Sequence, residues 1–188
     1  FLKFDAMREK IEFMTNAPKG LGKTTHLAFE LARSVCNEGM SLFSAFVMLL
    51  NFQRFGKMRG MCEIVEWSIR DESLHVEGMT KLFQEYCKEH PRVVTDKLKS
   101  YIYNNYEKAV ELEDGLVDLV FNNLNIEGLE SDQVKTYVRY LADRRLLQLG
   151  LKPIFGQKTN PLDWLYWVIS GDSFKNFFEG AVTDYSAD

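Results

Sequence analysis

Residues 61–88 read MCEIVEWSIRDESLHVEGMTKLFQEYCK, a stretch without proline. Mainly apolar side chains recur along it in steps of three and four residues, except at two positions that are occupied by ionisable side chains, Glu72 and His75. The stripe consists of Met61, Val65, Ser68, Met79, Leu82 and Tyr86. Steps of this size place side chains on one face of an α-helix. The stretch therefore predicts a long helix from about Met61 to Lys88, which the following His90-Pro91 ends.

The rest of the chain has the same helical character. Further helices are predicted over Lys3–Met14, Thr24–Leu50, Thr95–Asn123 and Ser131–Gly150, with Ser131 as the N-cap of the last. Prolines and glycines after Lys152 indicate a loop, and a short aromatic-rich helix is predicted over Leu162–Ser170, where Trp164 and Trp167 seal the bundle end. No alternating strand pattern and no internal repeat occurs. We therefore expect one all-α domain, built as a helical bundle.

Composition limits the possible functions. The 188 residues are 46% apolar and 27% charged, as in an ordinary globular domain, and the net charge of −4 argues against nucleic-acid or anionic-membrane binding. No apolar run approaches the roughly 20 residues of a membrane span, and the N-terminus has no signal-peptide pattern. Three widely spaced cysteines indicate free thiols and a reducing cytoplasm. A chain that begins at Phe1 suggests a piece of a longer protein.

Three ionisable side chains interrupt the apolar stripes. Glu38 takes a stripe position in the Thr24–Leu50 helix, and Glu72 and His75 do so in the Met61–Lys88 helix. A buried carboxylate must shift its pKa, pair with a cation or bind a metal. Glu72 and His75 are three residues apart and project from one face, and carboxylate oxygen with imidazole nitrogen suits iron or manganese. The simpler alternative is a core histidine at 75 and an ion pair between Glu38 and Arg70.

The same residues make up half of a known ligand pattern. Dimetal sites in helical bundles use two lone carboxylates and two Glu-x-x-His helices. This chain offers one of each, because neither His26 nor His90 has a glutamate three residues before it. The sequence therefore predicts half of a dimetal site.

Several motifs, in order along nearly the whole chain, carry a resemblance to a known family. The stretch Ser68-Ile-Arg-Asp-Glu-Ser-Leu-His75 resembles the Arg-Asp-Glu-x-Leu-His motif of the small subunit of class I ribonucleotide reductase. The other matching stretches are Asn37-Glu38-Gly39 with Phe43, Ala45 and Phe46, Ala142–Leu146, Gln148–Leu151, Asn160–Trp164 and Asn176–Glu179.

The resemblance implies a ferritin-like fold with a dinuclear iron centre, or one of manganese, that reacts with O₂. A tyrosine is then oxidised to a radical, which the large catalytic subunit uses to reduce ribonucleotides. Glu38, Glu72 and His75 would be metal ligands. Asp71 would lie on the radical route and hold a ligand histidine, as carboxylates beside metal sites commonly do. One turn from the ligands, an apolar pocket would be lined by Leu42, Phe46 and Ser68.

The chain also departs from the family pattern. One carboxylate ligand, the second Glu-x-x-His and the radical tyrosine have no counterpart here, and none of the eight tyrosines matches the radical position. From the resemblance, the mobile tail that docks on the large subunit is expected to be missing beyond Asp188 as well. We therefore interpret residues 1–188 as the C-terminal half of a small subunit. The expected partners are an N-terminal fragment, a second small-subunit copy and the large subunit, with no nucleic acid and no membrane.

Two other functions remain open from the sequence. Two copies of the chain could complete a symmetric ferritin-like dimetal oxidase or metal-storage site, or the chain could be a non-catalytic helical module. A phosphate-loop function is not indicated by Gly20–Thr25, because Ala17 replaces the required glycine and a helix precedes the segment. The acidic run Glu111–Asp114 is expected to be a solvated helix face.

Overall fold

The computed structural model describes residues 3–16 and 20–165, and within these ranges it contains only helices and loops. The α-helices are α1 Asp5–Thr15, α2 Lys23–Gly39, α3 Phe43–Leu50, α4 Arg59–Glu89, α5 Asp96–Asn123 and α6 Ser131–Gln148. Two 3-10 helices, η1 Asn51–Phe55 and η2 Pro91–Val93, connect them. The predicted all-α architecture is confirmed.

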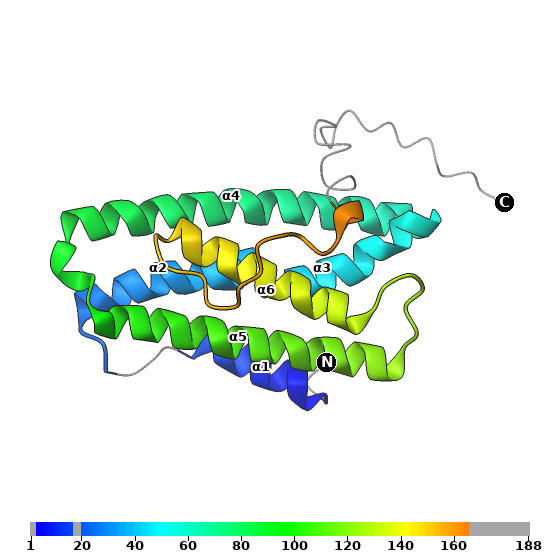
Figure 1. The fold of residues 1–188 in the computed structure, drawn as a ribbon, viewed down its shortest axis with the longest axis horizontal. Coiled ribbons are helices and arrows are strands. Elements are labelled where there is room, and N and C mark those ends of the chain that lie inside the picture. The colour runs from blue at the N-terminus through cyan, green and yellow to red at the C-terminus, as the bar shows by residue number, and fades with distance from the viewer. Residues whose placement is uncertain (1–2, 17–19, 166–188) are drawn as a thin grey trace.

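The helices form an elongated bundle whose inner element is α2 (Figure 1). It packs against both α4 and α5, while α6 lies on α5 and α3, and α1 lies along α5. Small side chains on α2, at Ala28, Ala32 and Gly39, are fully or nearly fully buried and let the neighbouring helices approach closely. This packing brings the middle of α4 beside the C-terminal turn of α2.

Most helix ends lie within two residues of their predicted positions. The helix α4 ends before Pro91, as predicted, and Thr95 caps α5 by accepting a hydrogen bond from the Leu98 amide. The expectation for Ser131 was wrong, because Glu130 is the N-cap of α6 and forms a capping box with Gln133. A helix, α1, precedes the Gly20–Thr25 segment, as expected.

The predicted continuous helix Thr24–Leu50 is interrupted. The helix α2 ends at Gly39 and α3 begins at Phe43, with Met40 in a non-helical conformation at φ −143° and ψ −51°. No proline marks this break in the sequence. Side chains from α1 and α6 donate hydrogen bonds to backbone carbonyl groups at this break, as described below.

The apolar stripes were also predicted slightly off the buried faces. Leu82 on α4 belongs to the predicted stripe, yet it is 55% exposed. The buried side of α4 instead follows Cys62, Val65, Ile69, Val76, Thr80 and Phe83. The stripe that contains Glu38, Glu72 and His75 therefore lies at the edge of the core, along the side where α2 and α4 face solvent.

The expectation of a solvated acidic run was wrong for Glu113. Its side chain is fully buried and forms an ion pair with Lys10 of α1, which is itself 7% exposed. The Ser44 hydroxyl of α3 donates a hydrogen bond to the same carboxylate. Burial raises the pKa of Glu113 above its ordinary value, and the positive charge of Lys10 opposes that rise.

The segment Lys23–Phe55 is long and apolar enough to span a membrane by length and composition, contrary to the expectation from the sequence. However, 61% of its most apolar window is buried inside the bundle, as in the core helix of a soluble protein. Cys36, Cys62 and Cys87 are free thiols, as predicted.

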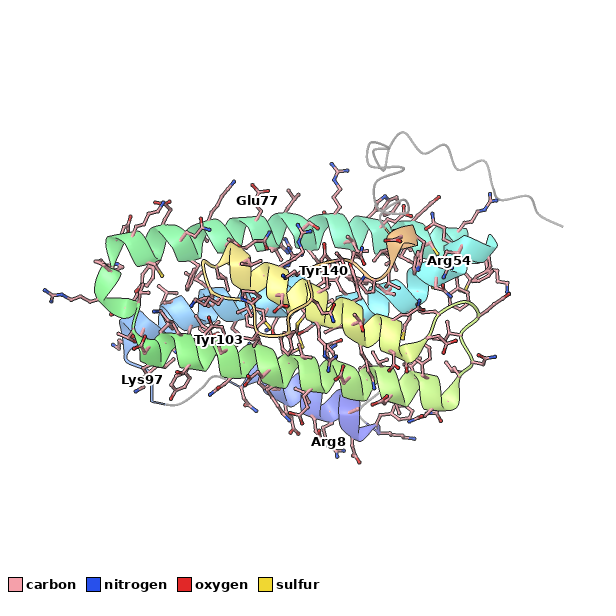
Figure 2. All side chains as sticks on the ribbon, in the orientation of Figure 1. Arg8, Arg54, Glu77, Lys97, Tyr103 and Tyr140 are labelled. Carbon is pink, nitrogen blue, oxygen red and sulfur yellow. The ribbon has the colours of Figure 1, made fainter. Side chains whose placement is uncertain are left out.

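Asp143 of α6 binds the loop that follows this helix and holds it against the bundle. This carboxylate is 2% exposed and accepts hydrogen bonds from the backbone amides of Ile154, Phe155 and Gln157 at 2.8–2.9 Å. The Tyr103 hydroxyl accepts a further one from the Lys152 amide (Tyr103 is labelled in Figure 2). Of the predicted helix Leu162–Ser170, the structure describes residues 162–165, of which 163–165 are helical. Residues 166–170, with Trp167, and the stretch Asn176–Glu179 lie outside the described residues. The Arg54 guanidinium lies 4.7 Å from the Trp164 ring.

An Asp143→Asn variant is expected to unfold with a free energy lowered by about 2–4 kcal/mol, because an amide cannot accept all three hydrogen bonds as a charged group does. Urea denaturation measures the loss, with exposed Glu107→Gln on α5 as the control. Unchanged amide exchange at residues 154–157 in Asp143→Asn would contradict the assigned role.

Candidate metal centre

Two neighbouring helices bring three potential ligands together. Glu38 lies on the last turn of α2, and Glu72 and His75 lie one turn apart on α4. The His75 Nδ1 atom is 3.3 Å from Glu38 Oε2 and 3.4 Å from Glu72 Oε2. One ligand atom from each residue lies within 4.8 Å of the other two. The structure thus places the three predicted site residues at one point.

The bonding of the two carboxylates leaves oxygen atoms available there. Glu38 Oε1 accepts a hydrogen bond of 2.6 Å from the Ser34 hydroxyl, so its orientation is fixed while Oε2 faces His75. Glu72 Oε2 is buried and accepts no hydrogen bond within the described part of the chain. Such an oxygen is costly unless a cation neutralises it. Two carboxylate oxygens and one imidazole nitrogen are a donor set that fits iron or manganese.

The expectation that all three side chains point into a core was wrong for His75. Its side chain is 59% exposed, whereas those of Glu38 and Glu72 are 29% and 22% exposed. The reason is that nothing in the described ranges covers this side of α2 and α4. Beside it lies a cavity of about 360 Å³ lined by Glu30, Leu31, Arg33, Ser34, Asn37, Glu38 and Met79.

The remaining predicted residues lie around this cluster without joining it. Asp71 is exposed and makes no hydrogen bond or ion pair with any described residue. Arg70 is exposed and forms no ion pair with Glu38, so the alternative pairing of these two residues does not occur in the described structure. Three further residues predicted to line an apolar pocket are partly buried: Leu42, Phe46 and Ser68.

Ser34 is a residue that the sequence interpretation missed. It precedes Glu38 by four residues on a helix, and this spacing is the signal that could have identified it.

We expect Ser34→Ala to weaken Co²⁺ binding to the cluster by about 10-fold, because partners that orient a ligand commonly contribute that much affinity. Isothermal titration checks this, with Ser73→Ala as the control, since the Ser73 hydroxyl donates to the Ile69 carbonyl. Equal affinity in both variants would contradict a role for Ser34.

Comparison with known proteins agrees with this fold. The family model described as ribonucleotide reductase, small chain, matches residues 1–161. The chain is 37% identical to the probable ribonucleoside-diphosphate reductase small subunit 048L of Invertebrate iridescent virus 3, covering 99% of this chain and 54% of that protein. It is also 37% identical to the ribonucleoside-diphosphate reductase subunit beta of Chlamydia pneumoniae, covering 92% and 49%.

Among solved structures, a putative class I ribonucleotide reductase from Bacillus halodurans superposes with a TM-score of 0.81 at 25% identity, over 89% of this chain and 61% of that one. The fold is thus that of a ferritin-like helical bundle with a carboxylate and histidine cluster between two of its helices. The chain belongs to the ribonucleotide reductase small-chain family. It spans about half the length of the curated relatives named above.

Proposed function

We propose that this chain is the C-terminal half of the radical-generating small subunit of a class I ribonucleoside-diphosphate reductase. In this proposal, Glu38, Glu72 and His75 supply half of the ligands of a dinuclear centre, of iron or alternatively manganese. The observation that carries the proposal is the convergence of two carboxylate oxygens and the His75 Nδ1 atom, in a chain of this family.

The remaining ligands come, in this proposal, from an N-terminal half that covers the open side of α2 and α4. The exposure of His75 supports this, as does the share of only 54% of the 048L relative that the chain covers. Exposed apolar side chains on α4, at Ile64, Leu74 and Leu82, offer further surface for packing. The assembled small subunit then pairs with a second copy and with the large catalytic subunit, in a reducing cytoplasm that suits the three free thiols.

The residues of this chain bind and orient rather than react. To bind a metal through Nδ1, the atom that faces the two carboxylates, His75 would carry its ring proton on Nε2. Ser34 directs one oxygen of Glu38 away from the cluster. Asp71 is free to accept a hydrogen bond from a ligand histidine of the covering half. When bound, the metal pair supplies the O₂ activation and one-electron oxidation from which the family takes its radical.

Co-expression with the coding region upstream of this chain tests the proposal. We expect a complex that contains two metal ions per pair of halves and shows the electron paramagnetic resonance signal of a tyrosyl radical after exposure to O₂. A well-folded complex with neither metal nor signal would overturn the proposal.

A symmetric dimetal protein is the alternative that the open ligand face also permits. Two copies of the chain would together provide two lone glutamates and two Glu-x-x-His helices, as such sites require. Metal analysis of the 188-residue chain purified alone distinguishes the two functions. A homodimer with a complete two-metal centre would favour the symmetric protein, whereas a split small subunit requires the second half.

A further inference from the structure

The break between α2 and α3 begins at Met40, two residues after the proposed ligand Glu38. The Phe43 amide, which would bind the Gly39 carbonyl in a continuous helix, donates instead to the Met40 carbonyl at 3.0 Å. The Met40 and Ser41 amides both donate to the Cys36 carbonyl. The carbonyl oxygens of residues 39 and 41 are therefore available to groups outside the helix, one and three residues after the ligand.

Two cationic side chains from distant elements occupy these carbonyl groups. Arg145 of α6 donates from Nε to the Gly39 carbonyl at 3.1 Å. Lys10 of α1 donates from Nζ to the Ser41 carbonyl. A cation at the C-terminal end of a helix is also favoured by the partial negative charge of its last carbonyls. The end of α2 is thus capped by side chains that lie far away in the sequence.

A carboxylate from a third element holds the lysine in place. Lys10 forms an ion pair with Glu113 of α5, which is fully buried and also accepts a hydrogen bond from Ser44 at the start of α3. A buried ion pair contributes little net stability compared with apolar residues of the same size. Its presence beside the break is therefore better explained by the geometry that it imposes than by stability.

The residue next to the ligand fits the same arrangement. A Cβ atom at Gly39 would lie 2.5 Å from Arg145 Nε and 3.0 Å from Arg145 Cδ. Only glycine lets the guanidinium group lie directly against the backbone at this position. Gly39 and Arg145 thus form one close contact, immediately after Glu38.

We propose that Lys10, Glu113 and Arg145 are positioning residues for Glu38, which hold the α2–α3 break so that the Glu38 carboxylate reaches the ligands on α4. This inference rests on the proposed metal-binding function. The three residues touch neither a metal nor a substrate. They act through the backbone carbonyls of Gly39 and Ser41, and their effect is to fix the ligand geometry before a metal binds.

Co²⁺ binding to the full 188-residue chain tests the inference, because the ion reports both affinity by titration and ligand geometry by its visible absorption. The variants are Arg145→Met, which removes the donor to Gly39, and Lys10→Met/Glu113→Gln, which removes the buried charges together. Arg145→Lys keeps a cationic donor. The control is Glu77→Gln/Lys81→Met, which removes an exposed ion pair of α4 (Glu77 is labelled in Figure 2).

We expect Arg145→Met and the Lys10/Glu113 double variant each to bind Co²⁺ about 10-fold more weakly, with an altered absorption band, as is common when partners of a ligand are removed. Arg145→Lys is expected to restore most of the affinity, and the control to match the wild type. Wild-type affinity and absorption in Arg145→Met, with unchanged helix content by circular dichroism, would overturn the inference. If the double variant fails to fold, the comparison of Co²⁺ affinity and absorption between Arg145→Met and Arg145→Lys is sufficient to test the positioning role.

A different result would identify failure of the proposed function itself. If the wild-type chain binds Co²⁺ with an affinity and a spectrum that Glu72→Ala leaves unchanged, the ion is not bound by the cluster. That outcome contradicts the metal site, whereas an effect of Glu72→Ala without an effect of Arg145→Met contradicts only the positioning role.

Discussion

A Glu72→Ala variant of the assembled small subunit is expected to lose its metal centre and, with it, ribonucleotide reduction. Glu72 Oε2 is buried, accepts no hydrogen bond from the described residues and lies 3.4 Å from His75 Nδ1, so the substitution removes a proposed ligand and leaves no substitute. We expect the metal affinity to fall by more than about 100-fold, because even partners outside the ligand set contribute about 10- to 100-fold.

Metal content and reductase activity measure this effect in the complex with the N-terminal half and the large subunit. The matched control is Glu85→Gln, which removes an exposed carboxylate of the same helix that pairs with Lys88. Wild-type activity in Glu72→Ala would contradict the proposed function and favour a non-catalytic helical module.

A Lys10→Met variant is expected to be strongly destabilised, by about 3–5 kcal/mol, because it leaves the Glu113 carboxylate buried without a cation. The double variant Lys10→Met/Glu113→Gln is expected to regain most of this loss, since neither charge then remains in the core. Urea denaturation of the wild type, both single variants and the double variant gives the coupling between the two residues. Additive losses would show that the pair does not interact as the structure indicates.

The same ion pair predicts how stability depends on pH. Burial raises the pKa of Glu113, so the folded state holds the proton more tightly than the unfolded state. The stability contributed by this group is therefore fully present below the ordinary carboxyl pKa and is lost as pH rises through the folded pKa. We expect this negative slope to persist to higher pH in Lys10→Met than in the wild type, because Lys10 no longer opposes the rise of the Glu113 pKa; urea midpoints across the pH range measure it. The same slope in both proteins would contradict the opposing effect of Lys10.

The helices were largely predictable from the sequence because their apolar patterns are long and regular. The break after Gly39 was not, since the side chains that bind its carbonyl groups, Lys10 and Arg145, lie far from it in the chain and meet it only after folding. Glu113 was misassigned for the same reason, because its partner Lys10 belongs to another helix. Part of the buried face of α2 was missed because it consists of Ala28, Ala32 and Gly39, small residues that hydrophobic patterns weigh little.

The site was predictable in part. The shared register of Glu38, Glu72 and His75 on two helices predicted that they would converge, and the structure places them together. Their exposure could not be predicted, because it depends on which segment covers the outer side of α2 and α4. Ser34 was missed because a serine four residues before a glutamate is common on helix surfaces and becomes informative only beside a ligand.

The most direct test of the metal centre is crystallographic. Crystals of the complex with the N-terminal half, loaded with Fe²⁺ or Mn²⁺, are to be measured at the absorption edge of the metal. We predict an anomalous peak within about 2.0–2.3 Å of His75 Nδ1 and of one oxygen each of Glu38 and Glu72, the spacing typical of nitrogen and oxygen ligands to divalent ions. An ordered complex whose metal lies elsewhere, with these side chains turned to solvent, would contradict the account.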